Sequence, residues 1–323
     1  MSALLLFNAS SIKANNSNMN LLDILTPLYL LIAFGSLLYK YQFPSLAFWP
    51  GIERMIYYVL FPTLIFVALV KAPVDMSLLG KVIIIILVPA LVASSLQSLG
   101  FLSPNISGPT FTSMFQGSMR NNTAISLVIA AWISPESGLG IMAVIILIMI
   151  PVNNITSVSV LMRFGSRKDL KTSSAWKNLA KNPLIIACFF GLFFNILGVQ
   201  FPKPLLATAD FLGRSALPFA LLSVGAGLRL NSFFDNKLAI TLSSLAKLFV
   251  TPLLCWLFCL LSNVEADVAK IAIIFSAMPT AVSSFILAKQ LGGDSETMAQ
   301  IITFQTLLAT LTIPLFLFIA QQY

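Results

Sequence analysis

The sequence predicts an all-α, polytopic membrane protein with ten transmembrane helices, arranged as two inverted five-helix repeats. Three observations support this fold class. First, 58% of the 323 residues are hydrophobic and only 9% are charged, which is more apolar surface than a water-soluble domain can bury. Second, the chain contains ten apolar runs, each of about the 20 residues that a helix needs to cross a bilayer. Third, the two halves of the chain align on each other.

The ten apolar runs are separated by polar or charged segments. We predict them at Leu21–Tyr39, Glu53–Val70, Lys81–Leu99, Phe111–Ser134, Leu139–Met162, Pro183–Val199, Leu205–Leu228, Leu238–Leu261, Val268–Leu291 and Thr297–Ala320. The runs are continuously apolar, whereas the strands of a membrane barrel alternate over about ten residues. Helices are therefore predicted, since they satisfy their own backbone hydrogen bonds in lipid.

Residues 1–20 are predicted to be a disordered N-terminal extension. The apolar run Ala3–Phe7 is too short for a signal peptide, and no basic residue precedes it. Met19 is an alternative start to Met1. The first predicted span would then act as the insertion signal.

A shift of 156 residues aligns the two halves of the chain, 21–162 and 183–323, on each other. The identities under this shift include Pro27 with Pro183, Gly35 with Gly191, Pro62 with Pro218 and Lys81 with Lys237. Each half holds five predicted spans. Because five is odd, the two halves must insert with opposite orientations, which defines an inverted repeat.

The distribution of basic residues predicts the orientation. Alternate connections collect five Lys and Arg residues on one side and eleven on the other, and basic residues are retained in the cytoplasm. We therefore expect both termini outside the cell inner (plasma) membrane and the basic loop 163–182 in the cytoplasm. This loop accounts for most of the net charge of +8, so little basis is left for nucleic-acid binding.

Two spans are interrupted by polar residues at their middles. The fourth span contains Gln116–Thr123 and the ninth contains Ser276–Ser284, and the shift of 156 places Thr123 on Pro279. Polar interruptions at membrane depth are tolerated where they line a site. The sequence therefore predicts that helices four and nine are broken and cross each other at the substrate site.

Pro279 is expected to unwind the ninth helix near Ala277–Thr280, because proline has no N–H and clashes with the preceding turn. A half-helix that begins there would present free N–H groups and a partial positive charge, which suit a carboxylate. The alternative is a simple kink in a packed helix, with Ser283 and Ser284 bonded back to the backbone.

Deep ionisable residues favour an anionic ligand. Arg120, Arg214 and Lys247 lie within predicted spans, and only Arg214 has a nearby acid, Asp210, four residues earlier on the same helical face. The surplus positive charge argues against a cation exchanger, which needs a deep carboxylate. For Lys247 the alternative role is to hold carbonyl groups of a broken helix.

The predicted substrate-binding residues are Arg120, Asn121, Asn122, Thr123, Met278, Pro279, Thr280, Ser283, Lys247, Asn153, Asn154 and Gln305. For Asn153, Asn154 and Gln305 the alternative is hydrogen bonding between helices. No metal site or other cofactor is predicted, because the chain has no His and no clustered carboxylates. Cys188, Cys255 and Cys259 fall within spans and are interpreted as packing residues. No nucleophile and base pair is apparent, so an enzyme is not predicted.

Several segments resemble the auxin efflux carrier family. They are Asn182–Ile185, Ala216–Pro218, Lys247–Pro252, Ala277–Ala281, Ala288–Asp294 and Thr306–Leu308. The resemblance extends from Leu21 and is strongest in the second half. It implies a ten-span transporter in which spans four and nine cross and move in an elevator-type cycle. Bacterial members resembling this chain include permeases for malate and malonate. One departure is that Ala124 and Ile129 stand where the family usually has Gly and Pro.

Together these observations predict a secondary transporter of a small organic anion, a carboxylate or dicarboxylate, that works by alternating access in the lipid bilayer. A membrane-embedded receptor that binds such an anion without moving it is the alternative, and an intramembrane enzyme is a third. The sequence leaves open the substrate, the direction of transport, a coupling proton or sodium ion, and a homodimeric state.

Overall fold

Helices make up 83% of the computed structural model, which describes residues 21–71, 77–104, 106–135, 137–166, 182–228 and 236–323, and these ranges contain no strand. The predicted extension 1–20 and residues 167–181 of the basic loop lie outside the described residues. The all-α class is confirmed for the part of the chain that the structure describes.

The first half of the chain forms eleven described helical elements, of which ten precede the long helix α9. They are α2 (Leu21–Lys40), α3 (Phe48–Met55), a π-helical turn η1 (Ile56–Leu60), α4 (Phe61–Lys71), α5 (Ser77–Val82), a π-helical turn η2 (Ile83–Leu87), α6 (Val88–Ser95), a 3₁₀ turn η3 (Leu96–Leu102), α7 (Gly108–Met119) and α8 (Thr123–Ile133). Helix α9 (Gly138–Phe164) follows and ends this half.

The second half repeats this succession of long and interrupted helices. Its described elements are α11 (Pro183–Ile196), α12 (Lys203–Arg214), α13 (Ala216–Ala226), α14 (Lys237–Leu245), a π-helical turn η4 (Ala246–Val250), α15 (Thr251–Ser262), α16 (Ala266–Ser276), α17 (Ser283–Leu291) and α18 (Ser295–Gln321). Local sequence explains several starts: Asn182 and Asp294 accept hydrogen bonds from the first turns of α11 and α18, as helix-capping residues do.

Six continuous helices in the described residues are long and apolar enough to cross a membrane. They are Phe48–Lys71, Gly80–Gly100, Gly138–Phe164, Lys203–Ala226, Lys237–Ser262 and Ser295–Gln321. Two shorter apolar helices, Thr26–Lys40 and Pro183–Ile196, match the first and sixth predicted spans. The fourth and ninth predicted spans coincide with the interrupted pairs α7–α8 and α16–α17.

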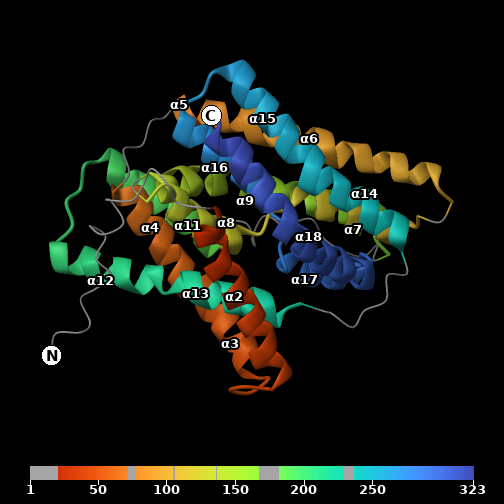
Figure 1. Cartoon of the computed structure of the whole chain (residues 1–323), viewed down its shortest axis with the longest axis horizontal. Helices are drawn as coiled ribbons and strands as arrows, with labels where there is room; N and C mark the ends of the chain where they lie inside the picture. Colours follow the sequence, from red (N-terminus) through yellow and green to blue (C-terminus); the bar gives the residue numbers. More distant parts are fainter. Residues whose placement is uncertain (1–20, 72–76, 105, 136, 167–181, 229–235) are drawn as a thin grey trace.

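Two helix pairs pack closely: α2 lies along α13, and α4 lies along α11 (Figure 1). Glycine permits the first approach, because a Cβ atom on Gly35 would collide with the Leu222 carbonyl and one on Gly225 with the Ile32 carbonyl. At the second, a Cβ on Gly191 would lie 2.9 Å from the Leu69 Cβ. Gly35 and Gly191 are the pair aligned by the 156-residue shift, so equivalent glycines serve equivalent contacts.

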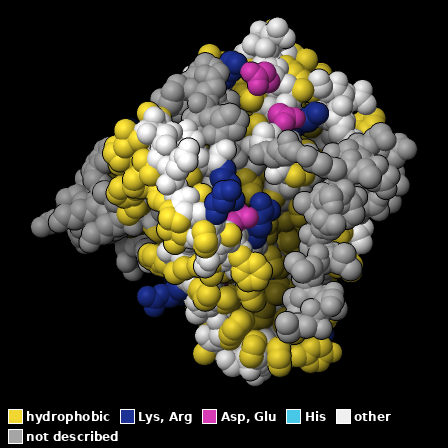
Figure 2. Space-filling model, turned by 90° about the vertical axis from the view of Figure 1, so that its left-hand side faces the viewer, with side chains coloured by type: hydrophobic (Ala, Val, Ile, Leu, Met, Phe, Trp, Pro, Cys, Tyr) yellow, Lys and Arg dark blue, Asp and Glu magenta, His cyan; other side chains and the backbone are white. Residues whose placement is uncertain are grey.

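The outer surface is apolar over much of its area. Figure 2 shows one face on which hydrophobic side chains predominate and charged groups are few. Large apolar side chains are exposed, with Phe211 at 85%, Leu261 at 74% and Leu311 at 71%. Such exposure would be costly in water, whereas lipid chains can cover it.

Candidate functional site: the two helix breaks

The two predicted helix breaks are present and touch each other. Residues 120–122 separate α7 from α8, and residues 277–282 separate α16 from α17. The Asn122 N–H donates to the Pro279 carbonyl over 2.8 Å, which joins the breaks through their backbones. Unwinding at Pro279 agrees with its missing N–H and its steric clash with the preceding turn.

The helices that follow the breaks begin differently. At α8 the Asn122 side-chain oxygen accepts from the N–H groups of Ala124 and Ile125, at 3.1 and 3.2 Å. These two donors are therefore already occupied. Helix α17 has no side-chain cap at Val282, its N-cap residue, and the N–H groups of Ser284 and Phe285 donate to the Ala281 and Val282 carbonyls over 3.0 and 3.1 Å. What an anion can use there is the positive potential of the helix start.

Hydrogen bonds of two buried residues, Thr280 and Gln305, connect the region of the two breaks to α18. The Gln305 amide donates to the Gly117 carbonyl over 2.9 Å, and its oxygen accepts from the Thr280 N–H over 3.0 Å. The Thr280 hydroxyl lies 2.6 Å from the Gly117 carbonyl and 2.7 Å from the Gln305 oxygen, and its one proton can serve either. Thr280 and Gln305 are fully buried. They therefore support the crossing rather than meet a ligand from solvent.

Arg120 has two neutral partners and lies at the open side of the crossing. Its terminal nitrogens donate to the Asn154 side-chain oxygen and to the Ser283 hydroxyl, each over 3.1 Å. Its Nε is buried and has no hydrogen-bond partner. Among the described residues no carboxylate forms an ion pair with it. The Ser283 contact brings this guanidinium to the uncapped start of α17.

The predicted site residues divide into two groups by exposure. Arg120, Thr123, Asn154 and Ser283 are partly or fully exposed. The buried members are Asn121, Asn122, Asn153, Lys247, Met278, Pro279, Thr280 and Gln305. Asn121 donates to the Phe275 carbonyl over 2.6 Å and so holds the first break against the end of α16. The exposed group is the part that a ligand can reach.

The alternatives left open by the sequence are partly resolved by these contacts. Ser283 accepts from Arg120, and the Ser284 hydroxyl has no partner in the described structure, so neither bonds back to its helix. Lys247 is fully buried and its Nζ has no partner among the described residues, so it holds no carbonyl group there. Gln305 bridges helices, as its alternative role required.

Two neighbours of the breaks were not among the predicted site residues. Tyr57, in η1, lies close enough to Arg120 to interact with its charge. Gln116, in the last turn of α7, is fully buried and both of its amide atoms lack partners in the described structure. Gln116 lies within the polar interruption of the sequence, whereas nothing in the sequence links Tyr57 to Arg120.

The deep pair Asp210 and Arg214 is present, with a 3.0 Å bond between the Asp210 carboxylate and the Arg214 Nε. Lys71, at the end of α4, lies 3.7 Å from the other Asp210 oxygen. Asp210 is thus shared by two cations. These three residues lie on α4 and α12, away from the two breaks.

The three free cysteines, Cys188, Cys255 and Cys259, are buried. No described group of three His, Cys, Asp or Glu could hold a metal ion.

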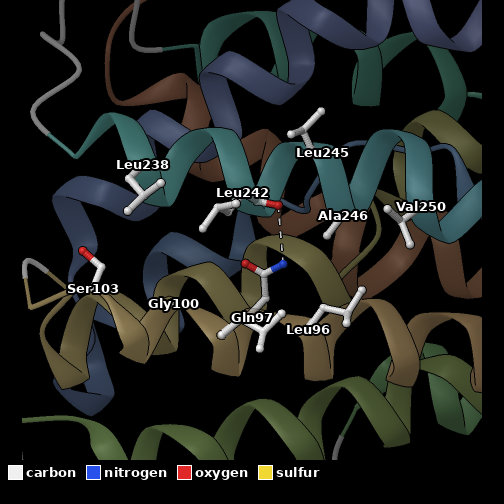
Figure 3. Close-up of a pocket in the computed structure, with 10 residues that line it drawn as sticks. Leu96, Gln97, Gly100, Ser103, Leu238, Leu242, Leu245, Ala246 and Val250 are labelled. Atoms are coloured by element: carbon white, nitrogen blue, oxygen red, sulfur yellow. Dashed lines mark hydrogen bonds between the residues drawn. The ribbon is translucent and has the colours of Figure 1, made fainter.

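One described groove lies outside the breaks. It has a volume of about 560 Å³ and lies between α6–η3 and α14–η4, lined mainly by leucines such as Leu96, Leu238 and Leu242 (Figure 3). Gln97 crosses it to donate to the Leu242 carbonyl over 3.4 Å. With no charged residue in its lining, this groove offers nothing to neutralise a carboxylate.

Residues 167–317, just under half of the chain, match the membrane transport protein family. A Rhizobium meliloti (strain 1021) protein named "Putative malonate transporter" is 28% identical over 138 residues, which are 42% of this chain and 43% of that protein. The resemblance to the auxin efflux carrier family is thereby confirmed, and the chain is a multi-pass membrane protein. The family description and the name of this relative both refer to transport.

Proposed function

We propose that this protein, a multi-pass membrane protein whose second half matches the membrane transport protein family, is a secondary transporter of a small organic anion. The observation that carries the proposal is Arg120, a partly exposed guanidinium at the uncapped start of α17. A permanent cation beside a positive helix end is unfavourable by itself and becomes favourable when an anion binds between them.

A carboxylate is the substrate class that fits this arrangement. The guanidinium can form two parallel bonds to one carboxylate, and the first N–H groups of a helix bind the same group. The relative named as a malonate transporter supports a dicarboxylate as the first substrate to test.

Equivalent contacts in the two halves support the inverted repeat of 21–162 and 183–323. The shift of 156 residues converts the α2–α13 pairing into the α11–α4 pairing. At the outer ends of the interrupted helices, Thr110 donates to Asp294 over 3.0 Å and Ser137 donates to Asp267 over 2.6 Å. The shift moves Thr110 next to Asp267 and Ser137 next to Asp294. The two hydrogen bonds are therefore related by the repeat, with donor and acceptor exchanged.

An elevator-type cycle fits the division of the molecule into two groups of helices. Helices α2, α4, α11, α12 and α13 pack against one another, while the two breaks belong to the group formed by α7–α9 and α14–α18. Movement of the second group against the first would carry the crossing between the two faces of the inner membrane. A stationary first group could also form a homodimer.

Flux in proteoliposomes tests the proposal. The purified protein should exchange labelled malonate, or another small dicarboxylate, faster than empty liposomes, and Arg120→Gln should remove most of this flux. Thermal stabilisation by the same anions measures binding separately, since a ligand at 100 times its dissociation constant adds about 2.7 kcal/mol. Binding without flux would identify a receptor, and the absence of both would contradict an anion site.

A further inference from the structure

Lys247 is a cation with no visible counter-charge in the interior of the helical bundle. Its side chain is 0% exposed, and its Nζ has neither a hydrogen bond nor an ion pair among the described residues. Burying an ammonium group in this way has a large desolvation cost in free energy, which no described partner offsets. The neutral amine is the less costly form as long as nothing else enters.

The helix register places Lys247 level with the first break. Met114 of α7 and Ala239 of α14 share a buried cluster, and one turn further a Cβ on Gly117 would lie 3.3 Å from the Ser243 Cβ. The two helices therefore run in the same direction. One further turn along α7, beyond Gly117, reaches the break at Arg120. One further turn along α14, beyond Ser243, reaches Lys247.

The second break lies at the same level. Leu248, the residue after Lys247, packs in one buried cluster with Met278 of the second break and Ala309 of α18. The buried Ser244 hydroxyl, three residues before Lys247, and both buried amide atoms of Gln116, in the last turn of α7, also have no described partner. Lys247 thus lies at the level of the two breaks, and the hydrogen-bonding capacity of the neighbouring helices is incompletely used.

The helices packed against η4 bring no carboxylate to this level. They are α6, α7, α14, α15 and α18. Helices α6 and α7 contain no titratable residue, and α15 contributes only Cys255 and Cys259. Lys237 and Glu296 lie in the first turns of α14 and α18. Lys237 is ten residues from Lys247, or about 15 Å along the helix. Arg120, the one other cation at this level in the described structure, increases the cost of a second positive charge.

We propose that Lys247 is the coupling group of the transporter: it takes up a proton when the anion enters the crossing and releases it when the anion leaves. This inference rests on the proposed transport function. The Nζ lone pair forms an N–H bond with a proton from the aqueous phase to which the site is open. That bond breaks on the opposite side, after the anion has gone, and no other bond changes. Each anion therefore crosses with one proton.

Arg120 and Lys247 have different roles in this scheme because their side chains differ in how they hold a proton. A guanidinium stays charged in proteins, so Arg120 attracts the anion in every state, whereas a buried lysine can lose its proton. The anion stabilises the ammonium form of Lys247 and, by reciprocity, a protonated Lys247 strengthens anion binding by the same factor. Sodium has no role in this scheme.

Accumulation of labelled malonate in proteoliposomes tests the inference. With the membrane potential clamped at zero, an exterior one pH unit more acidic should raise the accumulated concentration ratio about tenfold, as expected for one proton per anion. Lys247→Met should abolish this accumulation. Lys247→Arg, whose charge is permanent, should bind malonate but not accumulate it. Lys237→Met, at the exposed start of the same helix, is the matched control and should behave as the parent.

Proton uptake in detergent provides a second measurement. In weakly buffered solution, malonate addition should remove about one proton per site from the medium for the parent and none for Lys247→Met, with folding checked by monodispersity. Malonate flux that is independent of the pH gradient would overturn the inference and leave the proposed transport function intact. Gradient-driven accumulation by Lys247→Met would also overturn it. If malonate, malate and succinate all fail to move, the transport function fails, and the inference with it.

Discussion

Arg120 and Arg214 differ in what surrounds their guanidinium groups. Arg214 has a carboxylate at 3.0 Å, shared with Lys71, whereas Arg120 has an amide oxygen and a hydroxyl. A neutral acceptor solvates a cation without cancelling its charge. Arg120 therefore retains the attraction for an anion that Arg214 has largely lost to Asp210.

Replacing Arg120 tests this difference. We expect Arg120→Gln to weaken malonate binding by about 1.5–3 kcal/mol, the usual contribution of a hydrogen bond to a charged group, or roughly 10- to 150-fold. Arg120→Lys keeps the charge but not the planar fork, so a smaller loss is expected. Affinity is measured in detergent by calorimetry. Arg214→Gln is the matched control and should bind as the parent does; equal losses in both glutamine variants would show that Arg120 has no special contact with the anion.

Residue contacts could be predicted only where sequence spacing determines them. The bond between Asp210 and Arg214 follows from their four-residue spacing on one helix. The third member, Lys71, comes from α4 and required the fold. The same holds for Asn154 and Ser283 at Arg120, which approach from α9 and α17. Burial was also beyond the sequence, because polar residues of one break can face either the open side or the interior.

At the scale of the helix, the break at residues 277–282 depends on Pro279. Restoring a continuous helix would remove the helix start at Ser283, with its positive potential, without changing hydrophobicity. We therefore expect Pro279→Ala to insert and fold but to lose most of its flux. Expression, monodispersity and malonate flux are compared with those of Pro314→Ala, in which the proline lies inside the unbroken helix α18. Undiminished flux in Pro279→Ala would mean that the proline only bends a packed helix.

The α2–α13 contact makes a prediction about stability. A methyl group on Gly225 would collide with the Ile32 backbone carbonyl, which cannot move without displacing α2. We expect Gly225→Ala to lower the free energy of unfolding by about 1–3 kcal/mol, as overpacking commonly does. Gly51→Ala in α3, where nothing lies within 4 Å, is the control and should be neutral or stabilising. Thermal unfolding in one detergent measures both; an unchanged midpoint for Gly225→Ala would mean that the helices separate easily.

The helix breaks were predicted from the sequence and the π-helical turns were not. Proline and a cluster of polar residues mark the breaks at 120–122 and 277–282, because both interrupt an apolar helix. The turns η1, η2 and η4 lie inside apolar runs, and each ends two residues before a proline: Pro62, Pro89 or Pro252. A proline clashes with the carbonyl four residues earlier, which falls inside the turn in all three cases. Because a proline can also produce a simple kink, its presence does not by itself select a π-helical turn. Turn η4 carries Lys247.

At the scale of the molecule, the proposed internal repeat has more support from the helix contacts than from the sequence identities. Few identities support the 156-residue shift, yet Gly35 and Gly191 occupy related close contacts. The contact between Asn122 and Pro279 nearly maps onto itself under the shift, as a contact near a two-fold axis should. Side chains can diverge while helix packing persists, so sequence identity underestimates the symmetry of the fold.

The proposed inverted repeat also predicts how the protein is oriented in the membrane. Ten spans would bring both termini to one side, and the excess of basic residues in loop 163–182 selects the outside for the termini and the cytoplasm for the loop. In a background with Cys188, Cys255 and Cys259 replaced by Ser, an impermeant thiol reagent on intact cells should label Gln321→Cys and not Lys168→Cys. Permeabilised cells control for the reactivity of position 168. Strong labelling at 168 in intact cells, with none at 321, would invert the topology, and labelling of both would require an even number of spans in the second half of the chain.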